Sequence, residues 1–126
     1  MIDVKRESVF DYVKKIKAND GKTLGYRVML DVEYYSHRYK KHIKVSKGDR
    51  SDGATFAKDL NSFGWLIHDE LCSKGVFKNG DKCSNLQASH VLTDIMKREG
   101  YWFRTRTWFW ATWLFGGGKA RKNGMI

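Results

Sequence analysis

The spacing of hydrophobic and polar positions in this chain changes near its middle. Up to about residue 50 the two kinds alternate, as in the stretch at residues 23–35, TLGYRVMLDVEYY. A period of two is typical of a half-buried β-strand. From about residue 59 the apolar residues recur every three or four positions, which indicates amphipathic helices. Strands followed by helices predict an α+β fold.

The first part predicts an antiparallel hairpin or small sheet over about residues 9–50. Residues 9–17, VFDYVKKIK, fit a helix as well as a strand, but the Asn19-Asp20-Gly21 turn after them favours a strand that pairs with residues 23–35. Residues 41–48, KHIKVSKG, alternate again and predict a third strand that ends at Gly48.

The second part predicts about three helices. The first spans about residues 59–73, with Asp59 or Asn61 as its N-cap. The second spans about residues 85–99 and stops at Gly100, and an aromatic run at 101–115 predicts a third helix or helical turn. The apolar side of the second helix is expected to carry Leu86, Val91, Leu92, Ile95 and Met96.

Length and composition indicate one domain. The 126 residues suffice for a single core, with the β part at about 9–50, the helical part at about 58–116 and a basic, glycine-rich tail at 116–126. The longest apolar stretch, residues 108–115, is too short to cross a bilayer as a helix. The first ten residues, MIDVKRESVF, are charged where a signal peptide needs an apolar segment, so we expect no secretion by a signal peptide.

The net charge of +10 favours acidic partners, namely nucleic acid, an anionic membrane or an acidic protein surface. The basic residues are spread widely along the chain, so we interpret most of them as serving solvation and the electrostatics of assembly.

Two cysteines, Cys72 and Cys83, flank a loop. Their spacing permits a disulfide, but a reduced pair is favoured where nothing indicates export.

Several segments, taken in order, resemble one known family. They are KANDGKTLGYRVMLDVEYY, HIKVSKGDRSDGAT, LIHDELC and ASHVLTDIMKREG. Across roughly residues 10–116 the chain is similar to the phage-associated domain of unknown function family 1353, with SDGAT and IHDEL as the most specific parts. The resemblance implies phage origin and a strand, turn, strand, loop and helix order. Ser89 stands where the family is expected to have an aspartate, and Cys72 stands where it has a tyrosine.

An adjacent pair, His68 and Asp69, is the main candidate for chemistry. If Asp52 in the loop before the first helix reaches this pair, an imidazole and carboxylates would form a catalytic acid/base set or a divalent metal site, with Ser89 or His90 completing it. The alternative, which we favour, is a polar clasp that joins the loop to the helix without catalysis. Ser89 leaves fewer anionic ligands for a hard cation, so the sequence favours a protein that is not an enzyme. If the chain is an enzyme, the sequence indicates a hydrolase.

The C-terminal aromatic and basic segment is the candidate interface. Its large rings cannot share one narrow helical stripe, so either they close over the sheet or some of them face a partner. A protein surface is the first expectation, before single-stranded nucleic acid or a membrane surface. The predicted interface residues are Trp102, Arg104, Arg106, Trp108, Trp110, Trp113, Lys119 and Arg121.

These features together predict a phage-encoded accessory structural protein of the virion, associated with the tail, neck or capsid. Its expected partners are other phage structural proteins or further copies of itself, in the virion or the infected-host cytoplasm. A metal-dependent hydrolase used in entry or lysis is the first alternative. A nucleic-acid-binding or host-directed phage protein is the second.

Overall fold

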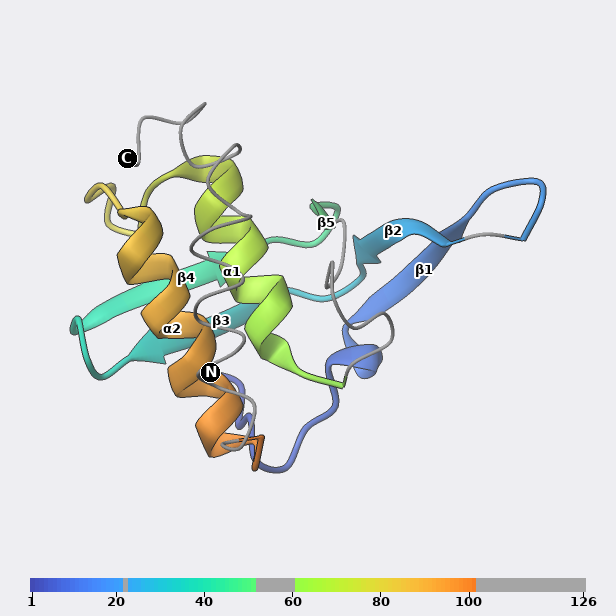
Figure 1. Ribbon diagram of the computed structural model, residues 1–126. Helices are drawn as coiled ribbons and strands as arrows, with labels where there is room; N and C mark the ends of the chain where they lie inside the picture. The colour runs from blue at the N-terminus through green and yellow to red at the C-terminus, as the bar shows by residue number, and fades with distance from the viewer. Residues whose placement is uncertain (22, 52–60, 102–126) are drawn as a thin grey trace.

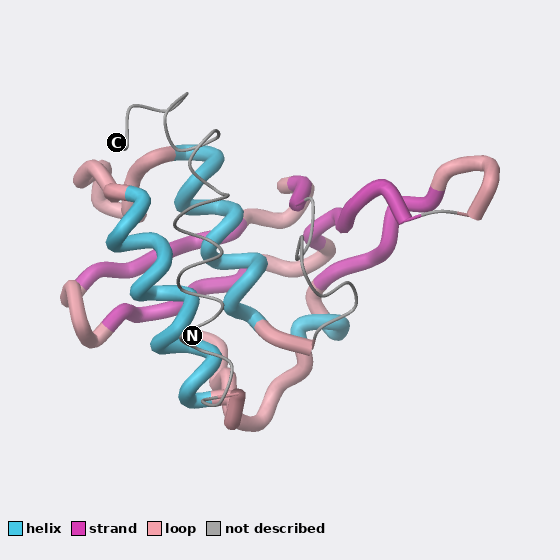
Figure 2. The backbone as a smooth tube through the Cα atoms, viewed as in Figure 1, coloured by secondary structure: helices cyan, strands magenta, loops and turns pink. Residues whose placement is uncertain are grey.

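The computed structural model describes residues 1–21, 23–51 and 61–101. Its elements confirm the predicted α+β class, with strands first and helices after them (Figures 1 and 2). In chain order they are the 3-10 helix η1 (Val9–Asp11), the strands β1 (Val13–Lys17), β2 (Thr23–Val28), β3 (Val32–Ser36), β4 (Lys41–Val45) and β5 (Arg50–Ser51), and the helices α1 (Phe63–Lys74) and α2 (Asn85–Arg98).

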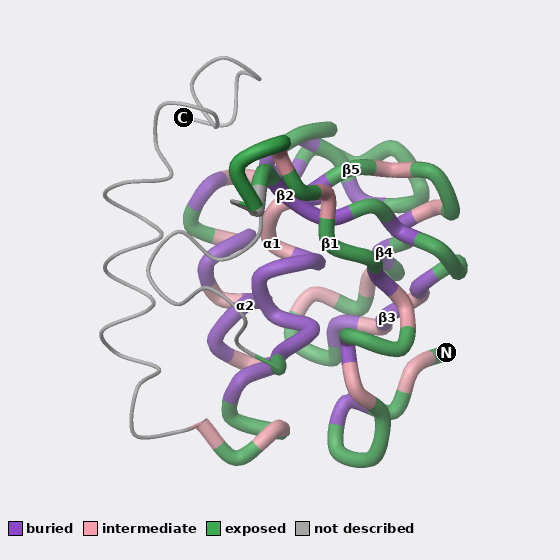
Figure 3. Tube along the Cα trace, turned by 90° about the vertical axis from the view of Figure 1, so that its right-hand side faces the viewer, coloured by how far each residue is buried: buried purple, intermediate pink, exposed green. Residues whose placement is uncertain are grey.

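A three-stranded antiparallel sheet has the order β1-β2-β5. The predicted hairpin around the Asn19-Asp20-Gly21 turn is confirmed, because β1 pairs with β2 with Val13 opposite Val28. Gly21 has a φ of 82°, a backbone conformation that glycine adopts without steric cost. The hairpin extends away from the two helices (Figure 1), and its tip at residues 19–21 is exposed (Figure 3).

The expectation of one strand over residues 23–35 is wrong. The chain leaves the first sheet after Val28 and enters a separate two-stranded sheet at Val32, where β3 pairs with β4. Residues 29–31 make the transition, and Met29 and Leu30 are 41% and 53% exposed. The predicted third strand is confirmed as β4, although it ends at Val45 and Gly48 lies in the turn that leads to β5.

Helix α1 starts later than predicted. Its N-cap is Ser62, whose Oγ accepts the Gly64 N–H at 3.0 Å, while Asp59 lies outside the described residues. Asn61 instead serves the N-terminal segment, because its Oδ1 accepts the Val9 N–H at 3.1 Å. The helix ends at Gly75, which has a left-handed φ of 71°.

Helix α2 agrees with the prediction within one residue. Ser84 and Gln87 form a reciprocal capping box at its start, and Gly100 follows its end with a φ of 95°. Leu86 is the one wrong assignment, since it is 44% exposed, whereas the other four predicted apolar residues are at most 1% exposed.

The core lies between the helices and the inner faces of both sheets. Strands β3 and β4 lie under α1 and α2 (Figure 1), and their buried residues, such as the paired Tyr34 and Ile43, belong to the core. The first sheet joins this core at its base through Tyr26, whose ring lies 4.9 Å from that of Trp65 on α1. One face of this sheet therefore packs against α1, and on the other face the described side chains of Lys14, Arg27 and Arg50 are exposed. The predicted third helix at 101–115 and the tail at 116–126 lie outside the described residues, apart from Tyr101.

Candidate functional site

The predicted pair lies on α1 as expected. His68 and Asp69 are both half-buried, but Asp52 lies outside the described residues, so the three-residue set stays a prediction. One turn along the same helix, the Cys72 sulfur lies 3.6 Å from Nε2 and 4.0 Å from Nδ1 of His68. The thiol of Cys72 is 2% exposed. The contact therefore belongs to the packing of α1.

Ser89 and His90 lie on α2, in different surroundings. Ser89 is fully buried. His90 is half-buried, and burial, followed by the charge of Arg38, lowers its pKa. Arg38 forms a two-bond pair with Asp94, with both bonds at 2.8 Å, and this pair joins the β3–β4 turn to α2. His90 thus lies beside a cation, which opposes the binding of a second cation.

Within the described ranges, no group of three or more His, Cys, Asp or Glu side chains is close enough together to hold a metal ion. The described members of the predicted metal set, His68, Asp69 and His90, therefore do not form such a group among themselves. The full set with Asp52 stays untested.

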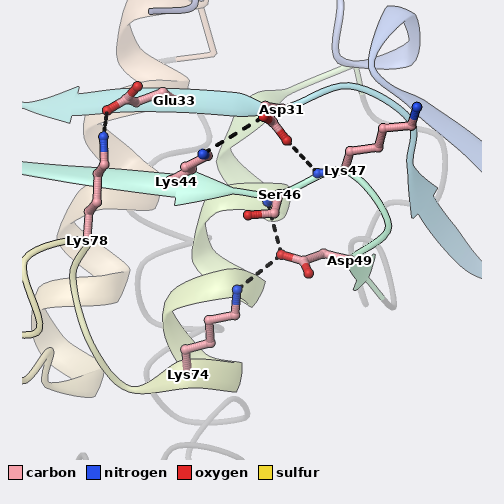
Figure 4. Close-up of polar contacts among 8 residues, drawn as sticks. All are labelled: Asp31, Glu33, Lys44, Ser46, Lys47, Asp49, Lys74 and Lys78. Atoms are coloured by element: carbon pink, nitrogen blue, oxygen red, sulfur yellow. Dashed lines mark hydrogen bonds and ion pairs between the residues drawn. The ribbon is translucent and has the colours of Figure 1, made fainter.

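The buried carboxylate of the IHDEL segment is Glu70, which the sequence reasoning missed. Glu70 is 8% exposed and forms an ion pair with Lys74, one turn further along α1. The Lys74 Nζ also lies 3.1 Å from Oδ2 of Asp49, in the turn before β5 (Figure 4). Desolvation raises the pKa of Glu70, against the opposing effect of Lys74. Helical spacing gives the signal, because position 70 follows Leu66 and Ile67 on the buried face.

These three residues make a polar clasp between a sheet and a helix. We predicted such a clasp from Asp52, His68 and Asp69, and the described residues form one from Asp49, Glu70 and Lys74. Asp49 is itself held by its own turn, since its Oδ2 accepts the Ser46 N–H at 3.0 Å (Figure 4). Asp49 is therefore held by its own turn and by Lys74, and this arrangement fixes the turn before β5 to α1.

A second carboxylate, Glu99, ties the two helices together. Its Oε1 accepts the Ser62 hydroxyl at 2.5 Å and its Oε2 accepts the Phe63 N–H at 2.8 Å. Burial raises the pKa of Glu99 to about 7, although both hydrogen bonds oppose this shift. The side chain at the end of α2 thus caps the first turn of α1.

The outer face of the β3–β4 hairpin carries further acid–lysine pairs. Lys78 donates to Glu33 Oε1 at 2.6 Å, and Lys44 Nζ lies 3.9 Å from Asp31 Oδ2 (Figure 4). Lys78 is the main cause of the lowered pKa of Glu33. These exposed pairs offset much of the local positive charge.

The face of the first sheet that points away from α1 has a different character. There Lys14 lies opposite Arg27 and Arg27 lies opposite Arg50, and all three are exposed. The sequence reasoning did not single out these residues, because their alignment appears only once the strand registers are known. All eight predicted interface residues, from Trp102 to Arg121, lie outside the described residues.

Comparisons with known proteins give no match: no family model, no curated protein and no solved structure matches the chain. The resemblance to the phage family therefore stays an expectation. Neither of the described helices combines the length and apolar composition needed to cross a membrane.

Proposed function

We propose that this chain is a phage-encoded accessory protein of the virion that binds a neighbouring structural subunit. The observation that carries the proposal is the β1–β2 hairpin, which extends from the helical body (Figure 1). We call residues 13–30, with Lys22 outside the described set, the arm. The base of this hairpin is anchored in the core by Val13, Tyr26 and Val28, while the part that projects beyond the base is open to a partner.

Exposed apolar side chains support a protein partner at the arm. Leu24, Met29 and Leu30 are 54%, 41% and 53% exposed, and they lie within or directly after β2. Exposed large apolar side chains along one projecting element are typical of protein–protein contacts. The polar pairs elsewhere, such as Asp49 with Lys74, are already satisfied within the chain.

Mass spectrometry of purified virions tests the proposal. We expect the chain at a fixed ratio to the major structural proteins, and we expect the variant Leu24→Ser/Leu30→Ser to be lost from particles. The matched control is Val76→Ser/Leu86→Ser, which removes apolar side chains of 37% and 44% exposure away from the arm and should leave incorporation unchanged. Both variants need a native circular dichroism spectrum before the comparison is made.

Two results would contradict the proposal. One is a chain that is produced in infected cells but missing from particles. The other is purified protein that carries close to one equivalent of divalent metal, lost in a folded His68→Ala variant, which would favour the metal-dependent hydrolase instead.

A further inference from the structure

Three cationic side chains stand in a row across the outer face of the first sheet. Residues that are directly opposite in an antiparallel ladder point to the same face. Lys14 of β1, Arg27 of β2 and Arg50 of β5 are opposite one another in turn, so their side chains share one face. We call this set the cation row. Tyr26 and Ser51, one position along, are also paired and are both buried, which confirms that the cation row is on the other face.

The cation row is an unfavourable arrangement for the isolated chain. Neighbouring strands lie about 4.8 Å apart, so the row spans roughly 10 Å from Lys14 to Arg50. Like charges directly opposite one another destabilise a sheet. Among the described residues, none of the three side chains forms an ion pair with a carboxylate.

Many other basic side chains of the described part are paired. Their partners come from the same chain, in the pairs Arg6–Asp3, Arg38–Asp94, Lys41–Asp81, Lys44–Asp31, Lys74–Glu70 and Lys78–Glu33. The cation row is set apart by its register, which places three cations that are unpaired among the described residues directly opposite one another on neighbouring strands. Such a row suits an external anion.

We infer that the cation row receives an acidic helix of the neighbouring protein subunit, an inference that rests on the function proposed above. Carboxylates three and four residues apart lie on one helical face about 5–6 Å from each other. Acidic residues at positions i, i+3 and i+7 span about 10.5 Å along the axis, which matches the length of the row. A helix laid across the three strands would therefore bring one carboxylate to each cation. Both arginines are suited to two-bond pairing with carboxylates.

The neighbourhood of the row favours protein over nucleic acid as the partner. Met29 and Leu30 are exposed directly after β2, and Ile16 is half-buried two positions along β1 from Lys14. Apolar side chains beside arginine are typical of the centre of a protein interface. A phosphate backbone gives them nothing to pack against. The row itself contains no aromatic side chain on which a base could stack.

The test measures binding of the full chain to a labelled alanine-based helical peptide with Glu at i, i+3 and i+7, at low ionic strength. The same peptide with Gln at those positions and a DNA duplex of similar length are the comparison probes. The row variant is Lys14→Gln/Arg27→Gln/Arg50→Gln. The control is Lys5→Gln/Lys82→Gln/Lys97→Gln, which removes three exposed charges elsewhere and lowers the net charge equally.

We expect the row variant to bind the Glu peptide at least about tenfold more weakly, the control variant to change by less than about threefold, and the Gln peptide not to bind. Equal losses in both variants would overturn the inference, since net charge alone would explain them. Tighter, row-dependent binding of the duplex would overturn it in favour of nucleic acid.

Incorporation into particles separates this inference from the proposed function. If the row variant enters virions as well as the control variant does, the cation row is not the contact, although the virion role stands. If the unaltered chain is missing from virions yet binds the Glu peptide through the row, the proposed virion role is wrong. The inference that the cation row binds an acidic helix is then still supported.

Discussion

Glu99 caps the helix that begins at Phe63: its Oε2 accepts the Phe63 N–H at 2.8 Å, from the end of the neighbouring helix. One carboxylate thus connects the last turn of α2 to the first turn of α1. A helix N-terminus favours negative charge, while burial of this group favours its neutral form. Burial prevails, because the pKa of Glu99 is raised to about 7.

Glu99 should make stability depend on pH. The pKa is about 7 in the folded chain against an ordinary value of 4.5, so folding takes up a proton between these pH values. Stability is therefore highest below about pH 4.5 for this group, falls as the pH rises to about 7, and is level above that. The change is on the order of 2 kcal/mol once partial solvent contact is allowed for.

Urea unfolding of the wild type and Glu99→Gln at several pH values isolates this term. Glutamine keeps an oxygen for the Phe63 N–H but does not titrate, so the fall between pH 4.5 and 7 should shrink by the stated amount. Glu99→Ala should lose about 1 kcal/mol from the missing cap. Parallel pH profiles for the wild type and Glu99→Gln would contradict this assignment.

Lys74 should be needed most at alkaline pH. Desolvation raises the pKa of Glu70, and Lys74 opposes the shift, so Lys74→Met leaves a buried carboxylate without its counter-charge. We expect a loss of about 1–2 kcal/mol at pH 8 and a smaller loss at pH 5, where Glu70 takes up a proton more readily. The free energy of unfolding in urea at both pH values measures this difference.

Two variants control the Lys74 experiment. Lys78→Met removes an exposed partner of Glu33 and should have little effect at either pH. Glu70→Gln/Lys74→Met removes both charges and should recover part of the loss at pH 8. A Lys74→Met loss that is independent of pH would show that the lysine stem, and not its charge, matters.

Gly64 should not tolerate alanine, even though alanine is the better helix former. A Cβ at this buried position would lie 2.6 Å from Cδ1 of Leu92 and 3.3 Å from the Leu92 carbonyl oxygen. Overpacking of this kind costs about 1–3 kcal/mol, which outweighs the roughly 1 kcal/mol gained in helix propensity. Thermal or urea unfolding of Gly64→Ala should show the net loss.

A double-mutant cycle with Leu92→Ala tests the cause of that loss. If the clash with the Leu92 side chain is responsible, the double variant should be more stable than the sum of the two single losses predicts. Strict additivity would instead place the clash on Ser62 Oγ, 3.0 Å from the added Cβ, or on the Leu92 carbonyl oxygen.

The sequence was most informative where local signals agreed. The apolar spacing over residues 85–99 and Gly100 at its end predict the same helix, and the structure has it as α2. The break after Val28 carried no such signal, since alternation continues through residues 29–31. Only the separate pairing of β2 with β1 and β5, and of β3 with β4, defines it.

Long-range contacts explain the other errors. Asn61 is a good N-cap by residue type, but it binds the backbone of Val9, more than fifty positions away, and leaves the cap to Ser62. The cation row is equally invisible in the sequence, because Lys14, Arg27 and Arg50 are far apart in the chain. Helical spacing alone predicts that Glu70 is a buried carboxylate. The interpretation of the sequence missed it because it concentrated on the adjacent His68 and Asp69.

The cysteines should be unreactive while the chain is folded. Cys72 and Cys83 are thiols that form no disulfide with each other, as we favoured from the sequence, and they are 2% and 1% exposed. Burial raises the pKa of Cys83 to about 12, so almost none of it is thiolate near neutral pH, and the thiolate is the reactive form.

With Ellman's reagent at pH 8 we expect very slow labelling of the native chain and rapid labelling of both thiols in urea. Ser73→Cys places an exposed thiol beside Cys72 on α1 and should react at once without denaturant. Rapid labelling of the unaltered native chain would contradict the burial of these thiols, and no labelling in urea would mean that they form a disulfide.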